Sequence, residues 1–66
     1  MKVHVNGEAR EFAEGLKLEE LMGLLGVRKE AVVAEVNLKI VPPAERADYR
    51  LGEGDRVELI QFVGGG

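Results

Sequence analysis

An alternating run broken by an Asn-Gly pair opens the chain, and it constrains the fold more than any other feature of the sequence. Apolar and polar residues alternate over the first five positions, and Asn6-Gly7 follows them. Asn-Gly is the strongest two-residue signal for a β-hairpin, because a type I′ turn needs positive φ at both central positions. We therefore predict a hairpin with strands at about residues 1–5 and 8–12.

The next periodic segment has the spacing of an amphipathic helix. Apolar residues recur at i, i+3, i+4 and i+7 from Leu18 to Leu25, and two glutamates lie in the first turn, where the helix dipole favours them. Gly26 is placed to end the helix. Lys17 stands where a Ser or Thr N-cap would add about 1 kcal/mol, and Gly23 costs about as much in the interior. We expect packing on a sheet to hold this helix.

Three later segments are typical of strands. Residues 31–37 alternate, residues 38–41 form a short partner, and residues 56–63 form a long apolar run. Pro42-Pro43 ends regular structure between them, and residues 44–48 are long enough for one helical turn. A hairpin, then a helix, then returning strands predicts an α+β fold: a mixed sheet of four to five strands with one main helix packed on one face. We expect the first and last strands to lie centrally and side by side.

Composition narrows the classes of function. The chain has 66 residues, 45% of them hydrophobic and 32% charged, which fits one soluble globular domain and not a disordered chain. The net charge of −3, with scattered Lys and Arg, disfavours nucleic-acid binding. No apolar run approaches 20 residues and no signal-peptide core is visible, so we expect no membrane partner and a cytoplasmic location.

The side chains offer little for catalysis. Ser, Thr and Cys are all absent, so the usual nucleophiles are missing. His4 is the single histidine and has no Cys or second His with which to share a metal, so we expect an exposed strand residue and no metal site. Glu19 and Glu20 are adjacent and point in different directions, which suits the helix dipole better than acid–base work. We therefore expect that the protein is not an enzyme and binds no cofactor itself.

The C-terminal glycines differ from the rest of the chain. We predict a folded domain over residues 1–63 and a flexible tail over residues 64–66, which can reach about 10 Å when extended. Glycine lacks a Cβ, so such a tail can enter a narrow slot in another protein. The other interpretation is a frayed terminus; the strand that leads directly into the glycines and the absence of other chemistry favour a working C-terminal carboxylate.

A docking surface next to the tail is also expected. If Val57 and Leu59 face the core, Ile60 and Phe62 face outward, with Val33 as a neighbour. Large apolar side chains on an outer face suggest a patch for a partner. The alternative is a bulge or a covering loop that buries them.

The chain resembles the ubiquitin-like β-grasp sulfur carriers over essentially its full length, and within them the ThiS family of thiamin biosynthesis. Two departures are visible: Lys17 replaces a hydroxyl residue at the helix start, which bears on stability, and Gly64 precedes the terminal pair at a small-residue position. The matching positions are the Asn6-Gly7 hairpin; Gly15, Leu18, Glu20, Leu21 and Met22; Val36, Asn37, Ile40, Val41 and Pro42; Leu51, Gly54, Asp55, Val57, Glu58, Leu59 and Ile60; and Gly65-Gly66.

This resemblance implies a β-grasp fold and a mechanism. An E1-like adenylyltransferase of the ThiF type would use ATP and magnesium to activate the terminal carboxylate. Sulfur from a persulfide donor would then give a thiocarboxylate that supplies a thiazole synthase of the ThiG type. The residues implied are Gly66 as the sulfur-bearing residue and Gly64, Gly65, Ile60, Phe62 and Val63 as partner-binding residues.

Three alternatives to this function stay open. The same carboxylate chemistry could serve molybdopterin synthase or another sulfur acceptor. A ubiquitin-like protein modifier would instead form an isopeptide with a target lysine. In a different class, the chain could be a non-catalytic β-grasp binding or regulatory module with an incidental tail, in which case deleting Gly65-Gly66 would leave its function unchanged.

Overall fold

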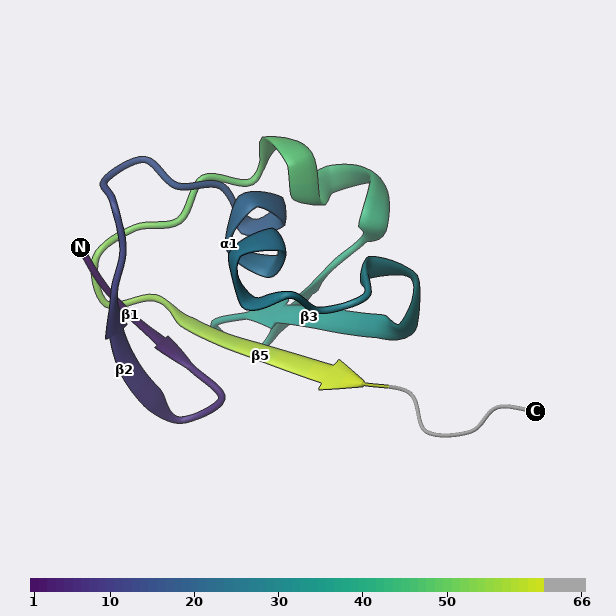
Figure 1. The fold of residues 1–66 in the computed structure, drawn as a ribbon, viewed down its shortest axis with the longest axis horizontal. Helices are drawn as coiled ribbons and strands as arrows, with labels where there is room; N and C mark the ends of the chain where they lie inside the picture. Colours follow the sequence, from purple (N-terminus) through teal and green to yellow (C-terminus); the bar gives the residue numbers. More distant parts are fainter. Residues whose placement is uncertain (62–66) are drawn as a thin grey trace.

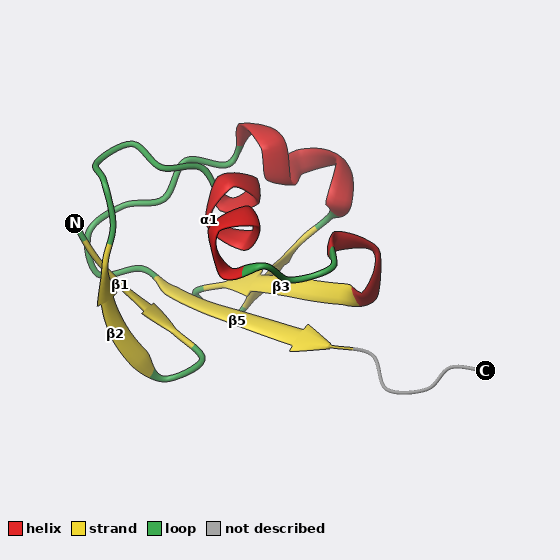
Figure 2. Ribbon diagram, viewed as in Figure 1, coloured by secondary structure: helices red, strands yellow, loops and turns green. Residues whose placement is uncertain are grey.

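A five-stranded mixed sheet with one helix across a single face makes up the fold (Figures 1 and 2). The computed structural model describes residues 1–61 of the chain. The sheet order is β2-β1-β5-β3-β4, with β1 and β5 parallel and the other pairs antiparallel. The predicted α+β class and the central pairing of the first and last strands are confirmed. The elements are β1 (Lys2–Val5), β2 (Glu8–Glu11), α1 (Leu18–Leu25), η1 (Lys29–Ala31), β3 (Val32–Val36), β4 (Lys39–Val41), η2 (Pro43–Asp48) and β5 (Arg56–Gln61).

The predicted Asn-Gly hairpin is confirmed. Asn6 and Gly7 have φ values of 50° and 83°, as a type I′ turn requires. β1 and β2 pair in the register that this turn sets, with Val5 opposite Glu8 and Val3 opposite Arg10. Because Val3 and Val5 are both buried, this register fixes which face of the hairpin joins the core.

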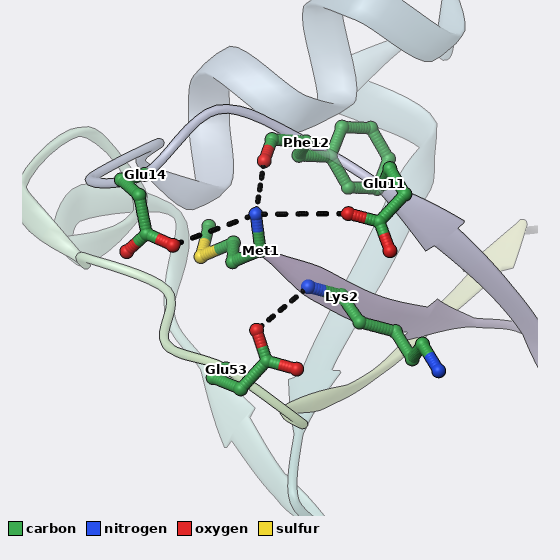
Figure 3. Close-up of polar contacts among 6 residues, drawn as sticks. All are labelled: Met1, Lys2, Glu11, Phe12, Glu14 and Glu53. Atoms are coloured by element: carbon green, nitrogen blue, oxygen red, sulfur yellow. Dashed lines mark hydrogen bonds and ion pairs between the residues drawn. The ribbon is translucent and has the colours of Figure 1, made fainter.

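Polar contacts fasten the open end of the hairpin (Figure 3). The Met1 ammonium donates to the Phe12 carbonyl and lies 3.9 Å from a Glu11 carboxylate oxygen and 3.6 Å from a Glu14 one. On the other side of β1, the Lys2 N–H donates to Glu53 at 2.9 Å. Both carboxylates near Met1 are largely exposed, so water screens these ion pairs and their contribution is small.

Helix α1 begins and ends where the sequence predicts. At its C-terminus, Gly26 has φ 73° and its N–H donates to the Gly23 carbonyl, which closes the helix with a left-handed glycine. At its start, Lys17 has no side-chain acceptor with which to cap the helix. Instead the Glu20 carboxylate accepts from the Lys17 N–H at 2.9 Å, and the Leu18 N–H donates to the carbonyl of Tyr49 at 2.8 Å. A long-range backbone contact thus replaces the missing cap.

The core lies between α1 and the inner face of the sheet. The helix contributes Leu18, Leu21 and Met22, all fully buried. Each fully buried aliphatic side chain contributes roughly 1.5–3 kcal/mol of transfer free energy. Packing of this helix face on the sheet therefore supplies much of the free energy that stabilises the fold. The buried sheet and loop residues are Val3, Val5, Val32, Ala34, Val36, Val41, Leu51 and Val57.

One buried charge was not predicted. The helical turn expected at residues 44–48 is present as η2, and Arg46 within it is only 3% exposed. Its Nη1 donates to the Lys29 carbonyl at 3.0 Å and its Nη2 to the Val32 carbonyl at 2.6 Å. Because the two prolines end β4 at Val41, no strand covers β3 at Val32, and the guanidinium takes the place of the missing backbone donor.

Candidate functional site

β5 is the element that leads to the C-terminal residues, and its side chains alternate between two environments. Val57 is fully buried and Leu59 packs against the core, while Glu58 and Ile60 lie on the opposite face. Ile60 is 47% exposed. The prediction that Ile60 faces outward is therefore confirmed, and no bulge or loop among residues 1–61 buries it. In Figure 1, β5 carries the chain away from the N-terminus.

Three polar side chains hold β5 in place. The Asn37 amide oxygen accepts from the Arg56 N–H at 3.0 Å, and its Nδ2 donates to Asp55 at 3.1 Å. The other Asp55 oxygen accepts from the Gly52 N–H at 2.8 Å. Further along the strand, the Asn6 amide oxygen accepts from the Leu59 N–H at 2.8 Å. Sequence reasoning missed these links because it treated Asn6 and Asp55 only as turn residues.

An exposed apolar surface lies on the outer face of the sheet beside β5. We call Val33, Ile40 and Ile60 the outer apolar patch. Val33 is directly opposite Ile60 across β3 and β5. Ile40 is 64% exposed and pairs with Glu35, which makes it a diagonal neighbour of Val33, at a distance that large side chains can span. Val33 was predicted as a neighbour of the outward-facing residues; Ile40 was missed, although alternation from buried Val41 would have placed it outward.

A pocket of about 320 Å³ continues from this patch past the end of β4. It shares Val33 and Ile40 with the patch, and its rim carries an ion pair in which Lys29 Nζ lies 3.7 Å from a Glu19 oxygen. No nucleophile or acid–base pair converges on it, so the pocket suits contact with an apolar group better than catalysis. The lining residues are Glu19, Lys29, Glu30, Val32, Val33, Ile40, Val41, Pro43 and Arg46.

Residues 1–61 contain neither a cluster of metal-ligating side chains nor a membrane-spanning helix. Over residues 1–61, no three His, Cys, Asp or Glu side chains are placed to hold a metal ion. His4 lies on β1 as predicted, but it is half-buried and not exposed. Within the same residues, no helix is both long and apolar enough to cross a membrane. The remaining predicted site residues, Phe62, Val63, Gly64, Gly65 and Gly66, lie outside the described residues.

Comparison with known proteins agrees with this fold. A crystal structure of a thiamine biosynthesis protein (ThiS) from Geobacter metallireducens matches with a TM-score of 0.88 and 33% identity, covering all of both chains. The sulfur carrier protein ThiS of Escherichia coli is 30% identical over 66 residues, again covering both chains completely.

Two longer relatives carry a different name. Thiazole synthases of Paramagnetospirillum magneticum and Magnetococcus marinus are 42% and 38% identical over 66 residues. The chain spans only 20% of the length of each. The family model described as the ThiS family matches residues 3–66, which is nearly the whole chain and includes its last glycine. Sequence and fold thus point to the same family, and the chain belongs to the ThiS family.

Proposed function

We propose that the chain carries sulfur on its C-terminal carboxylate, at Gly66, and delivers it for synthesis of the thiamin thiazole. The observation that carries the proposal is the family match through residue 66, on a body whose described side chains offer a binding surface and no catalytic group. The thiazole acceptor is favoured over molybdopterin because proteins named thiazole synthase contain a segment similar to this chain.

The first step is activation of a poor electrophile. In the active site of an E1-like adenylyltransferase, a Gly66 carboxylate oxygen attacks the α-phosphorus of ATP. The bond from that phosphorus to the bridging oxygen breaks, and pyrophosphate leaves with the charge of its oxygens offset by magnesium. The product is an acyl-adenylate, in which AMP is a good leaving group.

The second step introduces sulfur. The terminal sulfur of a protein persulfide attacks the Gly66 acyl carbon, and AMP leaves. A thiol then reduces the resulting acyl disulfide, which releases the C-terminal thiocarboxylate and leaves a disulfide on the donor side. The thiocarboxylate is a sulfur nucleophile that a thiazole synthase can use directly.

The body of the domain supplies the binding energy for these encounters. Ordering the three terminal glycines costs roughly 1–2 kcal/mol each, and contacts elsewhere must offset that cost. The outer apolar patch includes Ile60 on the strand that leads to the tail, and both Ile60 and Ile40 are exposed. We assign Ile60, with Phe62 and Val63 after it, to docking on the enzymes, and Gly64 and Gly65 to the narrow channel that leads to their active sites.

Intact-mass measurement tests this function. The chain is incubated with the adenylyltransferase encoded in the same genome, ATP, magnesium, a persulfide donor and a thiol. We expect the mass to rise by the difference between one sulfur and one oxygen. Gly66→Ala, or one Ala added after Gly66, is expected to melt at the same temperature as the parent chain and to load no sulfur. Undiminished loading of either variant would contradict the proposal.

A further inference from the structure

The two outer edges of the sheet are protected against pairing with other strands. Glu8, Arg10 and Glu11 make most of β2 charged, and all of its residues are exposed. β4 is only three residues long, begins with Lys39 and is followed by two prolines. Charged side chains, short strands and proline are the devices by which proteins keep exposed edges from pairing.

The inner strand β3 is protected as well. β4 ends at Val41, opposite Ala34, so the first part of β3 extends beyond its neighbour. There the Val32 carbonyl accepts from the buried Arg46 guanidinium at 2.6 Å. A side-chain cation therefore occupies the edge position that a further strand would otherwise take.

One edge in the described part of the chain lacks such protection, and it lies at the end of β5. Pairing of β1 with β5 stops at Val5 and Val57, and the Asn6 side chain adds one more contact at the Leu59 N–H. On its other side, β5 stays paired with β3 as far as Gln61. The last two residues of β5 therefore have a neighbouring strand on one side only, and Figure 1 shows β5 running on past the β1–β2 hairpin.

The backbone groups at this edge can be assigned by alternation. The carbonyls of Asp55 and Val57 accept from β1 residues, and the Leu59 N–H donates to Asn6. Odd-numbered residues of β5 therefore point their backbone groups toward β1. The Leu59 carbonyl and the Gln61 N–H and carbonyl lie on this side, beyond the last contact with the hairpin. No charged side chain or proline lies at positions 59–61.

We propose that this edge is a strand-addition site, at which the enzyme that receives the tail pairs an extended backbone segment with Leu59 and Gln61 of β5. The inference rests on the proposed function, since it takes an enzyme holding Gly66 as the occupant. Main-chain hydrogen bonds to an exposed sheet edge are an established mode of peptide recognition. Here they would fix the direction in which the chain leaves the domain.

The short chain between this edge and Gly66 indicates that the enzyme that binds Gly66 also occupies the edge. Gly66 is five residues beyond Gln61, at most about 17 Å of extended chain. An enzyme with Gly66 in its active site must therefore place its own surface alongside the end of β5. A second copy of this chain could pair with the same edge, but it has no site that would engage Gly66, so self-pairing would compete with loading instead of supporting it.

Two substitutions at position 61 distinguish the contribution of the backbone N–H to binding from that of the side chain. Gln61→Pro removes the N–H that faces the open edge, and no bond to β3 is lost because that N–H points away from β3. Gln61→Ala keeps the N–H and serves as the matched control. We expect both variants to melt at the same temperature, and Gln61→Pro to bind the adenylyltransferase with a Kd about tenfold or more above that of Gln61→Ala, which is about 1.4 kcal/mol or more per complex. Calorimetric titration measures both.

Amide hydrogen exchange of the parent chain gives a readout that needs no variant. In the complex with the adenylyltransferase, the Gln61 amide should exchange at least tenfold more slowly than in the free chain, while the Leu59 amide, already bonded to Asn6, changes little. Equal Kd values for the two variants, or an unprotected Gln61 amide, would overturn strand addition while leaving sulfur loading at Gly66 intact. A dimer of the parent chain in sedimentation that is lost in Gln61→Pro but kept in Gln61→Ala would assign this edge to self-pairing and would also overturn it. Absence of any binding or loading by the parent chain would refute both proposals.

Discussion

Replacing Gly23 by Ala should stabilise the protein, and the expected size follows from the position of Gly23 in α1. Gly23 is exposed in the interior of the helix, and a Cβ built there meets no atom within 4 Å. Ala in a helix interior makes the free energy of folding more favourable than Gly does by about 0.8–1.0 kcal/mol, because Gly loses more backbone entropy on folding. In a domain of this size, about 1 kcal/mol raises Tm by roughly 4–8 °C.

Gly26, the residue that ends the same helix, supplies the matched control. A Cβ at Gly26 also meets open space, so packing does not distinguish the two positions. Gly26 has φ 73°, and an L-residue in the left-handed region costs about 1–2 kcal/mol. Gly26→Ala should therefore lower the free energy of unfolding by about that amount, in a direction opposite to Gly23→Ala.

Thermal and urea unfolding followed by far-ultraviolet circular dichroism measure both changes. Two-state analysis is appropriate for a single domain of this length. If Gly23→Ala left Tm unchanged or lowered it, or if both variants shifted Tm in the same direction, backbone conformation would not be what separates these two glycines. Neither substitution should change sulfur loading at the C-terminus, because neither residue lies on the outer apolar patch.

Two further predictions concern the packing of Arg46 and the outer apolar patch. Arg46→Leu should lower the free energy of unfolding by about 2–3 kcal/mol, since the buried Val32 carbonyl and the part-buried Lys29 carbonyl lose a charged donor; urea unfolding measures it, and an unchanged midpoint would refute the role of the guanidinium. Ile40→Glu and Ile60→Glu should each weaken binding of the adenylyltransferase while changing stability by only about 0.5 kcal/mol. Leu24→Glu, at a residue 69% exposed on α1, is the control, and an equal loss of affinity there would show that the patch is not the contact.

Local patterns were sufficient to predict most of the secondary structure. The Asn6-Gly7 turn sets its own register because both residues accept positive φ. The helix bounds followed from apolar spacing and from Gly26, and the inner face of β3 from strict alternation. The central, side-by-side placement of the first and last strands followed from their apolar sequences. The prediction of Ile60 as outward-facing needed only the alternation of β5 from buried Val57.

Features that depend on distant parts of the chain were not predicted. Arg46 lies in a segment that looks solvated, and its burial depends on a gap left where β4 stops short of β3. The turn at Asn37-Leu38 places Leu38 at φ 71° with 89% of its surface exposed, against its local preference, because the strands on either side impose the turn. The hydrogen bond from the Leu59 N–H to the Asn6 side chain joins residues 53 positions apart, and no local sequence pattern predicts it.

The side-chain hydrogen bonds to β5 also explain how the end of this strand can lack a neighbouring strand on one side. Asn37 and Asp55 fix the beginning of β5, Asn6 fixes it at Leu59, and Val57 is fully buried between them. The strand is thus held over its first four residues, independently of what pairs with the last two. A partner that binds the end of β5 does not need to order the rest of the domain, so little of its binding free energy is lost to conformational entropy. Asn6→Gly removes the hydrogen bond from the Leu59 N–H to the Asn6 side chain. It should therefore weaken binding of the adenylyltransferase, because the partner must then order the end of β5 on binding. Asn6 itself makes no contact in the proposed strand pairing.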